Sequence, residues 1–141
     1  MQFSTIIVAV DVNDPDNGRA ALARAKAIAG SQGRLRLLYV RYFLPSRYSD
    51  LLISDFDARE QEDALKAMRQ WCEELGIGDD QVEMVTKRGR VRDEVLAEAK
   101  RQAADLIVLG SQQPSLSSKL LGSNASAIVH QSPVSVLVVR T

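Results

Sequence analysis

The chain has 141 residues, a length that suits a single domain over residues 1–141. Hydrophobic residues make up 45% and charged residues 26%, which is typical of a globular protein that buries a core. Eighteen basic residues balance eighteen acidic ones, and this balance argues against a protein that binds nucleic acid or an anionic membrane surface. One cysteine and one histidine exclude an internal disulfide and a Cys/His zinc cluster.

The N-terminal stretch carries no basic region and reaches an acid at Asp11, so we do not expect a signal peptide. The longest apolar run is far too short for a membrane span. We therefore expect a cytoplasmic protein. The cysteine, Cys72, lies beside Trp71 in a helical pattern and is interpreted as a packing residue.

The first half of the chain opens with a β-branched run at 5–10, which has no polar alternation and predicts a strand buried on both faces. Turn residues fill 11–18, and an alanine-rich segment predicts a helix over 18–29. A second strand is expected at 34–40. Residues 41–56 contain Pro45 and the aromatic residues Tyr42, Phe43 and Tyr48, and they are expected to be irregular.

The second half repeats the alternation of helix and strand. Apolar residues at helical spacing and short β-branched runs predict the remaining elements. We expect helices at 57–75, 91–101 and 122–131, strands at 82–86, 105–109 and 134–140, and a loop at 110–121.

This order of elements predicts an α/β fold with a five-stranded parallel sheet and helices on both faces, because successive parallel strands need right-handed crossovers. The expected strand order is 3-2-1-4-5, as in one half of a Rossmann-like fold, and the flavodoxin-like order 2-1-3-4-5 is the alternative. In the first order, strands 1 and 4 are neighbours at the switch point, where open α/β sheets bind ligands. The sequence therefore predicts a crevice between residues 11–14 and 110–113.

The start of the fourth predicted helix has the residues of a phosphate site. A helix N-terminus presents unpaired N–H groups and a positive dipole end. Gly122 would let a phosphate approach the backbone, and Ser123 and Asn124 would add donors. The alternative interpretation is that Ser123 only caps the helix.

Six segments spread along the chain carry a family resemblance: TIIVAVDV, LLYV, GRVRDEV, DLIVLGS, LLGSNAS and PVSVLVVR. Together they resemble the universal stress protein (Usp) family along the whole chain. GRVRDEV and GSQQPSLSSKLLGSNAS are the most specific segments, and they are similar to the short bacterial branch called UspF and UspG.

The resemblance implies a dimeric, adenine-nucleotide α-hydrolase-like domain that holds ATP, or ADP or AMP, with or without Mg²⁺. On the base side, Ala9 and Val10 would border the adenine, and Asp11 would lie beside the ribose and the adenine edge. The backbone of Val40 would face the adenine amine. Asp11 has a second interpretation, as a residue that caps its own turn.

The resemblance also implies the phosphate side of the site. Leu109 and Gly110 would lie beneath the ribose and the phosphates, and Ser111 would reach either a phosphate or only its own loop. The N–H groups facing the phosphates would come from the start of the fourth helix, at Gly122, Ser123, Asn124 and Ala125. Gln113 replaces the second glycine of the family motif.

Three functions follow as hypotheses. The leading one is an ATP-binding stress-response sensor or regulator with little or no turnover. The second is a dimeric interaction module whose nucleotide site is degraded at Gln113. The third is a slow ATPase or a protein that phosphorylates itself on Ser117, Ser118 or Ser123, although there is no Walker A sequence and no evident catalytic base.

Two further segments carry expectations. Lys87, Arg88, Arg90 and Arg92 either steer an anion toward the crevice or form a solvated loop, and the solvated loop is the favoured interpretation. Gly89 is expected to adopt a positive φ. The predicted strand 134–140 is an apolar sheet edge, so we expect it to pair with its copy in a homodimer.

Overall fold

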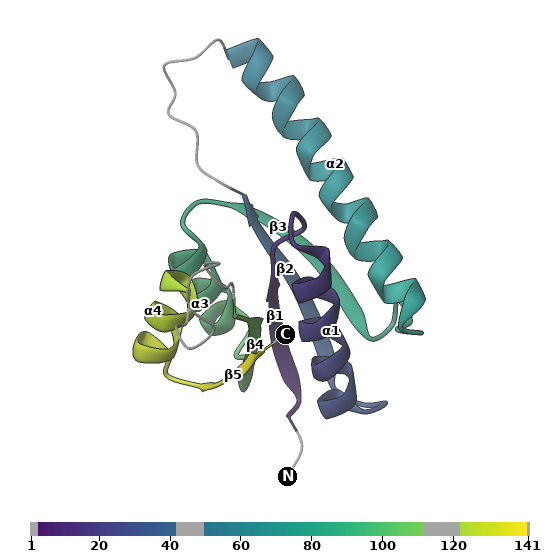
Figure 1. Cartoon of the computed structure of the whole chain (residues 1–141), viewed down its shortest axis with the longest axis vertical. Coiled ribbons are helices and arrows are strands. Elements are labelled where there is room, and N and C mark those ends of the chain that lie inside the picture. The colour runs from purple at the N-terminus through teal and green to yellow at the C-terminus, as the bar shows by residue number, and fades with distance from the viewer. Residues whose placement is uncertain (1–2, 42–49, 112–121, 141) are drawn as a thin grey trace.

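The computed structural model describes residues 3–41, 50–111 and 122–140 (Figure 1). Within these residues the chain forms one five-stranded parallel sheet of order β3-β2-β1-β4-β5, as the sequence predicts. The strands are β1 (Thr5–Val10), β2 (Arg34–Arg41), β3 (Val82–Arg88), β4 (Leu106–Gly110) and β5 (Ser135–Val139). The helices are α1 (Pro15–Ala29), α2 (Asp50–Glu74), α3 (Val91–Arg101) and α4 (Ser123–Gln131).

The helices cover both faces of the sheet in pairs. Helices α1 and α2 lie on one face, and α3 and α4 lie on the other (Figure 1). Strand β1 is central and pairs with β2 on one side and β4 on the other. Its residues Ile6, Ile7 and Val8 are fully buried, Ile6 and Val8 toward α1 and α2 and Ile7 toward α3 and α4. The apolar run without polar alternation is therefore explained by burial on both faces.

Helix α1 begins at Pro15, earlier than the predicted start at Gly18. Proline suits the first turn because its fixed φ is helical and its missing N–H would have no partner there. The Asp14 carbonyl accepts the Gly18 N–H at 3.0 Å, so Gly18 already lies inside the helix. A Cβ at Gly18 would come within 2.6 Å of the Trp71 ring, which explains a glycine at this position. The glycine is thus a packing residue and not a helix start.

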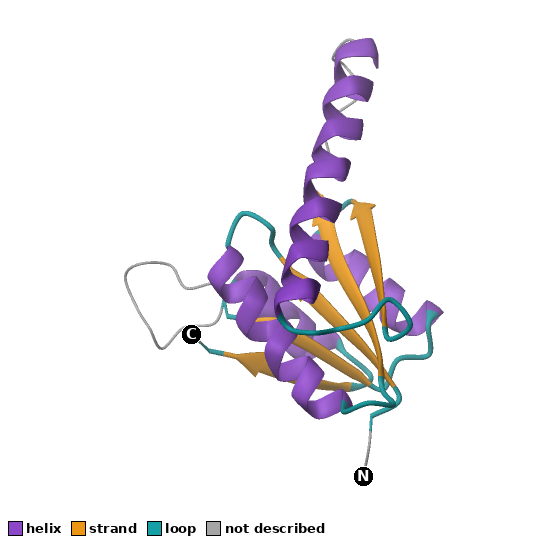
Figure 2. Cartoon of the chain, turned by 90° about the vertical axis from the view of Figure 1, so that its right-hand side faces the viewer, coloured by secondary structure: helices purple, strands orange, loops and turns teal. Residues whose placement is uncertain are grey.

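Helix α2 begins at Asp50, so the expectation of irregular chain up to Phe56 is wrong for its last seven residues. The 25 residues of α2 correspond to a length of about 37 Å. Its first turns extend beyond the strands of the sheet (Figure 2). The apolar stripe that predicts this helix starts only where the helix packs on the sheet, at Ala64, Met68 and Trp71. For this reason the stripe fails to mark the projecting turns.

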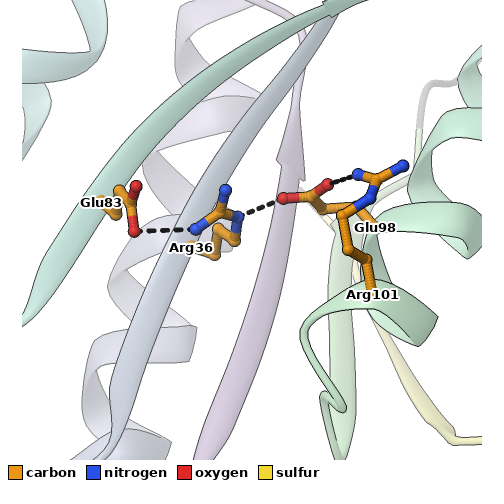
Figure 3. A network of polar contacts seen from close by, with 4 residues as sticks. All are labelled: Arg36, Glu83, Glu98 and Arg101. Carbon is orange, nitrogen blue, oxygen red and sulfur yellow. Dashed lines mark hydrogen bonds and ion pairs between the residues drawn. The ribbon is translucent and has the colours of Figure 1, made fainter.

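A buried ion network fixes α3 on the sheet (Figure 3). The Glu98 side chain is fully buried and accepts hydrogen bonds from Arg36 of β2 and from Arg101 of its own helix. Arg36 also donates to Glu83 of β3 at 2.7 Å. A buried carboxylate is costly unless its charge is paired and its oxygens are bonded, and here two guanidinium groups do both. The network therefore ties the C-terminal part of α3 to β2 and β3.

The cysteine is a core residue, as expected. Cys72 is 4% exposed, and its burial raises the thiol pKa to about 11. A thiol with this pKa stays protonated at neutral pH and is unreactive. Among the helices of the described residues, none is long and apolar enough to cross a membrane.

The contact between Gly18 and Trp71 gives a test of the packing between α1 and α2. Replacing a helical glycine by alanine in open surroundings adds about 0.5–1 kcal/mol of stability. Because the new methyl group would overlap the Trp71 ring, we expect Gly18→Ala to lower the free energy of unfolding by about 1–3 kcal/mol instead. Denaturant unfolding of Gly18→Ala in the wild-type and Trp71→Phe backgrounds measures the effect. A stabilising Gly18→Ala would contradict the packing.

Candidate functional site

A cavity of about 1120 Å³ lies at the carboxyl ends of β1, β2 and β4 and reaches the starts of α1, α3 and α4. This is the crevice that the strand order predicts, because β1 and β4 are neighbours whose connections leave toward opposite faces. Ten of the eleven predicted site residues line it, which brings distant segments of the chain into one place. These residues are Ala9, Val10, Asp11, Val40, Leu109, Gly110, Gly122, Ser123, Asn124 and Ala125.

Ser111 is the eleventh predicted residue, and it does not line the cavity. It is 1% exposed. Its backbone N–H donates to the Val139 carbonyl at 3.0 Å, and its carbonyl accepts from the Asn17 side chain at 3.1 Å. Ser111 thus lies beneath the cavity and ties the end of β4 to β5 and α1.

The turn between β1 and α1 forms one wall of the cavity. The Asp11 carboxylate accepts the Asn13 N–H at 2.9 Å, so the interpretation of Asp11 as a turn-capping residue is correct. The same residue lines the cavity, together with Asn13 and Asp14. Asn13 also donates to the Tyr39 hydroxyl at 3.4 Å. Burial is the main cause that raises the pKa of Tyr39, and the negative charge of Asp11 raises it further. The Tyr39 hydroxyl therefore stays neutral at physiological pH.

The start of α4 forms the opposite wall. Gly122 is the N-cap residue, and Ser123 is already the first residue of the helix, so the interpretation of Ser123 as the cap is wrong. Among the described residues, no side chain caps this helix end. The first intrahelical bond runs from the Ser126 N–H to the Gly122 carbonyl at 2.9 Å. The N–H groups ahead of Ser126 lie in the first helical turn, where the helix offers no acceptor. This end of α4 therefore presents donors and a positive dipole to the cavity.

The chain between β3 and α3 also lines the cavity, and the favoured interpretation as a solvated loop missed this. Gly89, Arg90, Val91 and Arg92 all contribute. Gly89 has φ 151°, as expected, and donates its N–H to the Arg41 carbonyl at 3.0 Å. The signal was present in the sequence, because a chain that leaves the carboxyl end of a parallel strand enters its helix at the ligand-binding edge of the sheet.

Asp57 of α2 holds the ends of β2 and β3 together. Its carboxylate accepts from Arg41 at the end of β2 and from Arg88 at the end of β3. Arg41 is 6% exposed and also donates to the Asp57 carbonyl at 3.0 Å. These bonds fix the strand ends directly beside Val40 and Gly89, so the wall of the cavity opposite β4 is rigidly supported.

Asn13 and Asp14 also line the cavity, in the turn where the strand order predicts the crevice. The other lining residues could not be recognised from motifs: Asn17 comes from the start of α1, and Leu38, Tyr39, Val95 and Ile128 are core residues that reach the cavity. Gln113, Ser115, Ser117 and Ser118 lie outside the described residues. In the described part of the chain, no group of three or more His, Cys, Asp or Glu side chains is arranged to hold a metal ion.

Comparison with known proteins agrees with this architecture. Residues 2–140 match the sequence profile of the universal stress protein family. The chain is 33% identical to universal stress protein G of Escherichia coli O157:H7 over 144 residues, which covers 98% of this chain and 99% of that protein. The chain belongs to the universal stress protein family. The match to the G protein supports the short UspG type that the sequence predicts.

Solved universal stress proteins share the fold. The structure of universal stress protein UspA from Lactobacillus plantarum superposes with a TM-score of 0.81 at 28% identity, covering 99% of each chain. A universal stress protein solved in complex with cAMP superposes with a TM-score of 0.75 at 20% identity, covering 99% of this chain and 98% of that one. At that identity the likeness establishes a common fold.

Proposed function

We propose that this universal stress protein binds an adenine nucleotide, ATP, ADP or AMP, in the cavity between β1 and β4. We propose further that it acts in the cytoplasm as a dimeric stress-response sensor or regulator with little or no turnover. The single observation that carries the proposal is the convergence of Asp11, the end of β2 and the start of α4 on one cavity. Each of these three supplies a different part of nucleotide recognition.

The base side of the cavity has the character that an adenine and its ribose need. Ala9, Val10, Leu38 and Val40 offer apolar surface to a planar base. The Asp11 carboxylate is an acceptor for ribose hydroxyl groups, as acids near the switch point are in nucleotide-binding α/β folds. Strand β2 ends beside this surface, where the Val40 backbone lies at the cavity.

The phosphate side of the cavity carries positive charge, in contrast to the Asp11 carboxylate on the base side. The start of α4 presents N–H donors, and Arg90 and Arg92 lie across the same cavity at the start of α3. The N-terminus of α4 and these two arginines bring positive charge to the cavity, and Arg92 also pairs with Asp93 at 3.8 Å. Asp11 and Asp14 lie at the cavity as well, and one or two carboxylates are enough to hold a Mg²⁺ ion that a nucleotide's phosphates already bind.

A relative with the same fold supports an adenine nucleotide as the ligand, since that protein is in complex with cAMP. The catalytic hypotheses have less support. Asp11 and Asp14 are the carboxylates at the cavity among the described residues, and no described histidine lines it. Hydrolysis needs a group that positions the attacking water in addition to a metal, and binding needs neither.

The first test is mass spectrometry of small molecules released from purified, denatured protein, together with calorimetric titration of the stripped protein with Mg-ATP. We expect an adenine nucleotide in the released fraction or a micromolar Kd. If neither is found, the proposal is wrong, and the alternative of a dimeric interaction module with a degraded site is favoured.

The N-cap of α4 gives a prediction about the phosphates. Gly122 has φ −60° and ψ 156°, a backbone conformation that any residue adopts, so a side chain there does not strain the backbone. We expect Gly122→Val to abolish binding of Mg-ATP in calorimetry, because its branched side chain blocks the approach of a phosphate to the helix end. Thermal unfolding should remain close to that of the wild type. Gly122→Ala is the matched control, with an intermediate affinity. If Gly122→Val binds Mg-ATP with wild-type affinity, the phosphates do not bind at the start of α4.

The ribose acid gives a second prediction. We expect Asp11→Ala to weaken Mg-ATP binding by about 1–3 kcal/mol, because a charged acceptor is lost. Asp11→Asn is the control, because its amide oxygen can still accept the Asn13 N–H and preserve the turn. If both variants bind like the wild type, Asp11 serves only the turn.

The exposed edge of β5 gives a prediction about the dimer. The Val139 carbonyl accepts the Ser111 N–H, so the backbone groups of Val139 face β4. Successive residues of a parallel strand face opposite sides, so the N–H of the neighbouring Val138 points away from β4 toward the open edge. We expect Val138→Pro to convert a dimer into a monomer in sedimentation analysis, because proline removes a donor from that edge without breaking the β4–β5 ladder. Val138→Thr keeps the N–H and should stay dimeric. A dimeric Val138→Pro protein would exclude β5 pairing.

A further inference from the structure

One side chain from α1 reaches under the cavity to the end of β4. Asn17, in the first turn of α1, is 7% exposed. Its Nδ2 atom donates to the Ser111 carbonyl at 3.1 Å, in a bond that is itself buried. Ser111 in turn donates its N–H to the Val139 carbonyl at 3.0 Å. One carboxamide therefore connects the start of α1 to the first residue after β4, which is already bonded to β5.

The same side chain explains why residue 110 is glycine. A Cβ on Gly110 would overlap the carboxamide oxygen and carbon of Asn17. Gly110 does not have a positive φ, so its backbone alone would accept any residue. The glycine is needed because the Asn17 carboxamide passes directly against the main chain at the end of β4. The glycine of the sequence motif is thus paired with a residue that no motif contains.

Asn17 and Gly110 also line the cavity, between the two walls that would hold the two ends of a nucleotide. Helix α1 starts directly after the turn that contains Asp11 and Asp14, which line the ribose side. Residues 110 and 111 begin the connection toward Gly122 on the phosphate side. A bond from α1 to Ser111 therefore fixes the distance between the Asp11 turn and the exit of β4.

We propose that Asn17 is a positioning residue of the nucleotide site. Its carboxamide holds the end of β4 against the start of α1, so that the ribose acid and the backbone beneath the phosphates keep one relative geometry. This inference depends on the proposed nucleotide function. The bond suits asparagine because a buried carbonyl needs a donor, and Nδ2 supplies a donor without adding charge next to a bound phosphate.

The test combines two substitutions whose effects on stability and on binding differ. Gly110→Ala introduces the methyl group that overlaps Asn17, and we expect a lower melting temperature. The double variant Asn17→Ala with Gly110→Ala removes the overlap, because the new methyl group enters the space that the carboxamide leaves. We expect it to recover most of the melting temperature that Gly110→Ala loses.

Nucleotide affinity should not recover in the same way. We expect Mg-ATP to bind about tenfold or more weakly to Asn17→Ala and to the double variant, because the bond from α1 to the Ser111 carbonyl is lost and the end of β4 can shift relative to α1. Met68→Ala is the control for lost stability, because Met68 lies on α2, is fully buried in the core and does not line the cavity. Its melting temperature should fall while its affinity stays at the wild-type value.

The outcomes separate the two proposals. A double variant or an Asn17→Ala protein that binds Mg-ATP like the wild type would overturn the positioning role and leave the nucleotide function standing. A wild-type protein that binds no nucleotide would overturn the proposed function, and the positioning role with it. An unchanged melting temperature in Gly110→Ala would contradict the close approach of Asn17 and overturn the inference at its first step.

Discussion

Burial of β1 on both faces is the constraint on which the rest of the structure depends. Ile6 and Val8 need one layer of helices and Ile7 needs the other, so the chain must cover both faces of the sheet. It does so by placing α1 and α2 on one face and then passing once to the other face, where α3 and α4 pack. Because β1 and β4 are neighbours whose connections leave in opposite directions, a crevice opens between them. The cavity is thus a consequence of core burial.

Ion pairs then tie the elements around the sheet together. Glu98 anchors the C-terminal part of α3 to β2, away from the crevice, and Asp57 ties the ends of β2 and β3 beside it. Withdrawing a carboxylate from water costs free energy, and each of these two is bonded by two arginines. Next to the Asp57 pairs, the chain that follows β3 and enters α3 brings Arg90 and Arg92 to the cavity. An acidic turn on one side and a basic region with helix N-termini on the other suit a ligand with a polar sugar and a phosphate chain.

The large features of the fold were predictable because they follow from repeating patterns. Short apolar and β-branched runs predicted the five strands, and the order 3-2-1-4-5 was correct over the flavodoxin-like alternative. Boundaries were less predictable where no core contact marks them. The start of helix α2 at Asp50 could not be predicted, because its first turns project past the sheet and no packing contact with the sheet marks them. Helix α1 starts at Pro15, whose fixed φ suits a first helical turn, and Gly18 lies inside the helix because the Trp71 ring leaves no room for a Cβ there.

The residues of the candidate site also divide into those that the sequence predicted and those that it did not. Ten of its predicted residues line one cavity because they follow strand ends and a helix start, and the order of elements determines those positions. The position of Ser111 beneath the cavity and the part played by Asn17 have one physical reason: a bond between residues 94 positions apart depends on how α1 packs against β4, and no local pattern indicates it. The sequence by itself therefore determined the family, the sheet and the edge where the cavity lies. Only the tertiary structure decided which side chains reach that edge, because side-chain contacts between distant segments exist only after the helices have packed on the sheet.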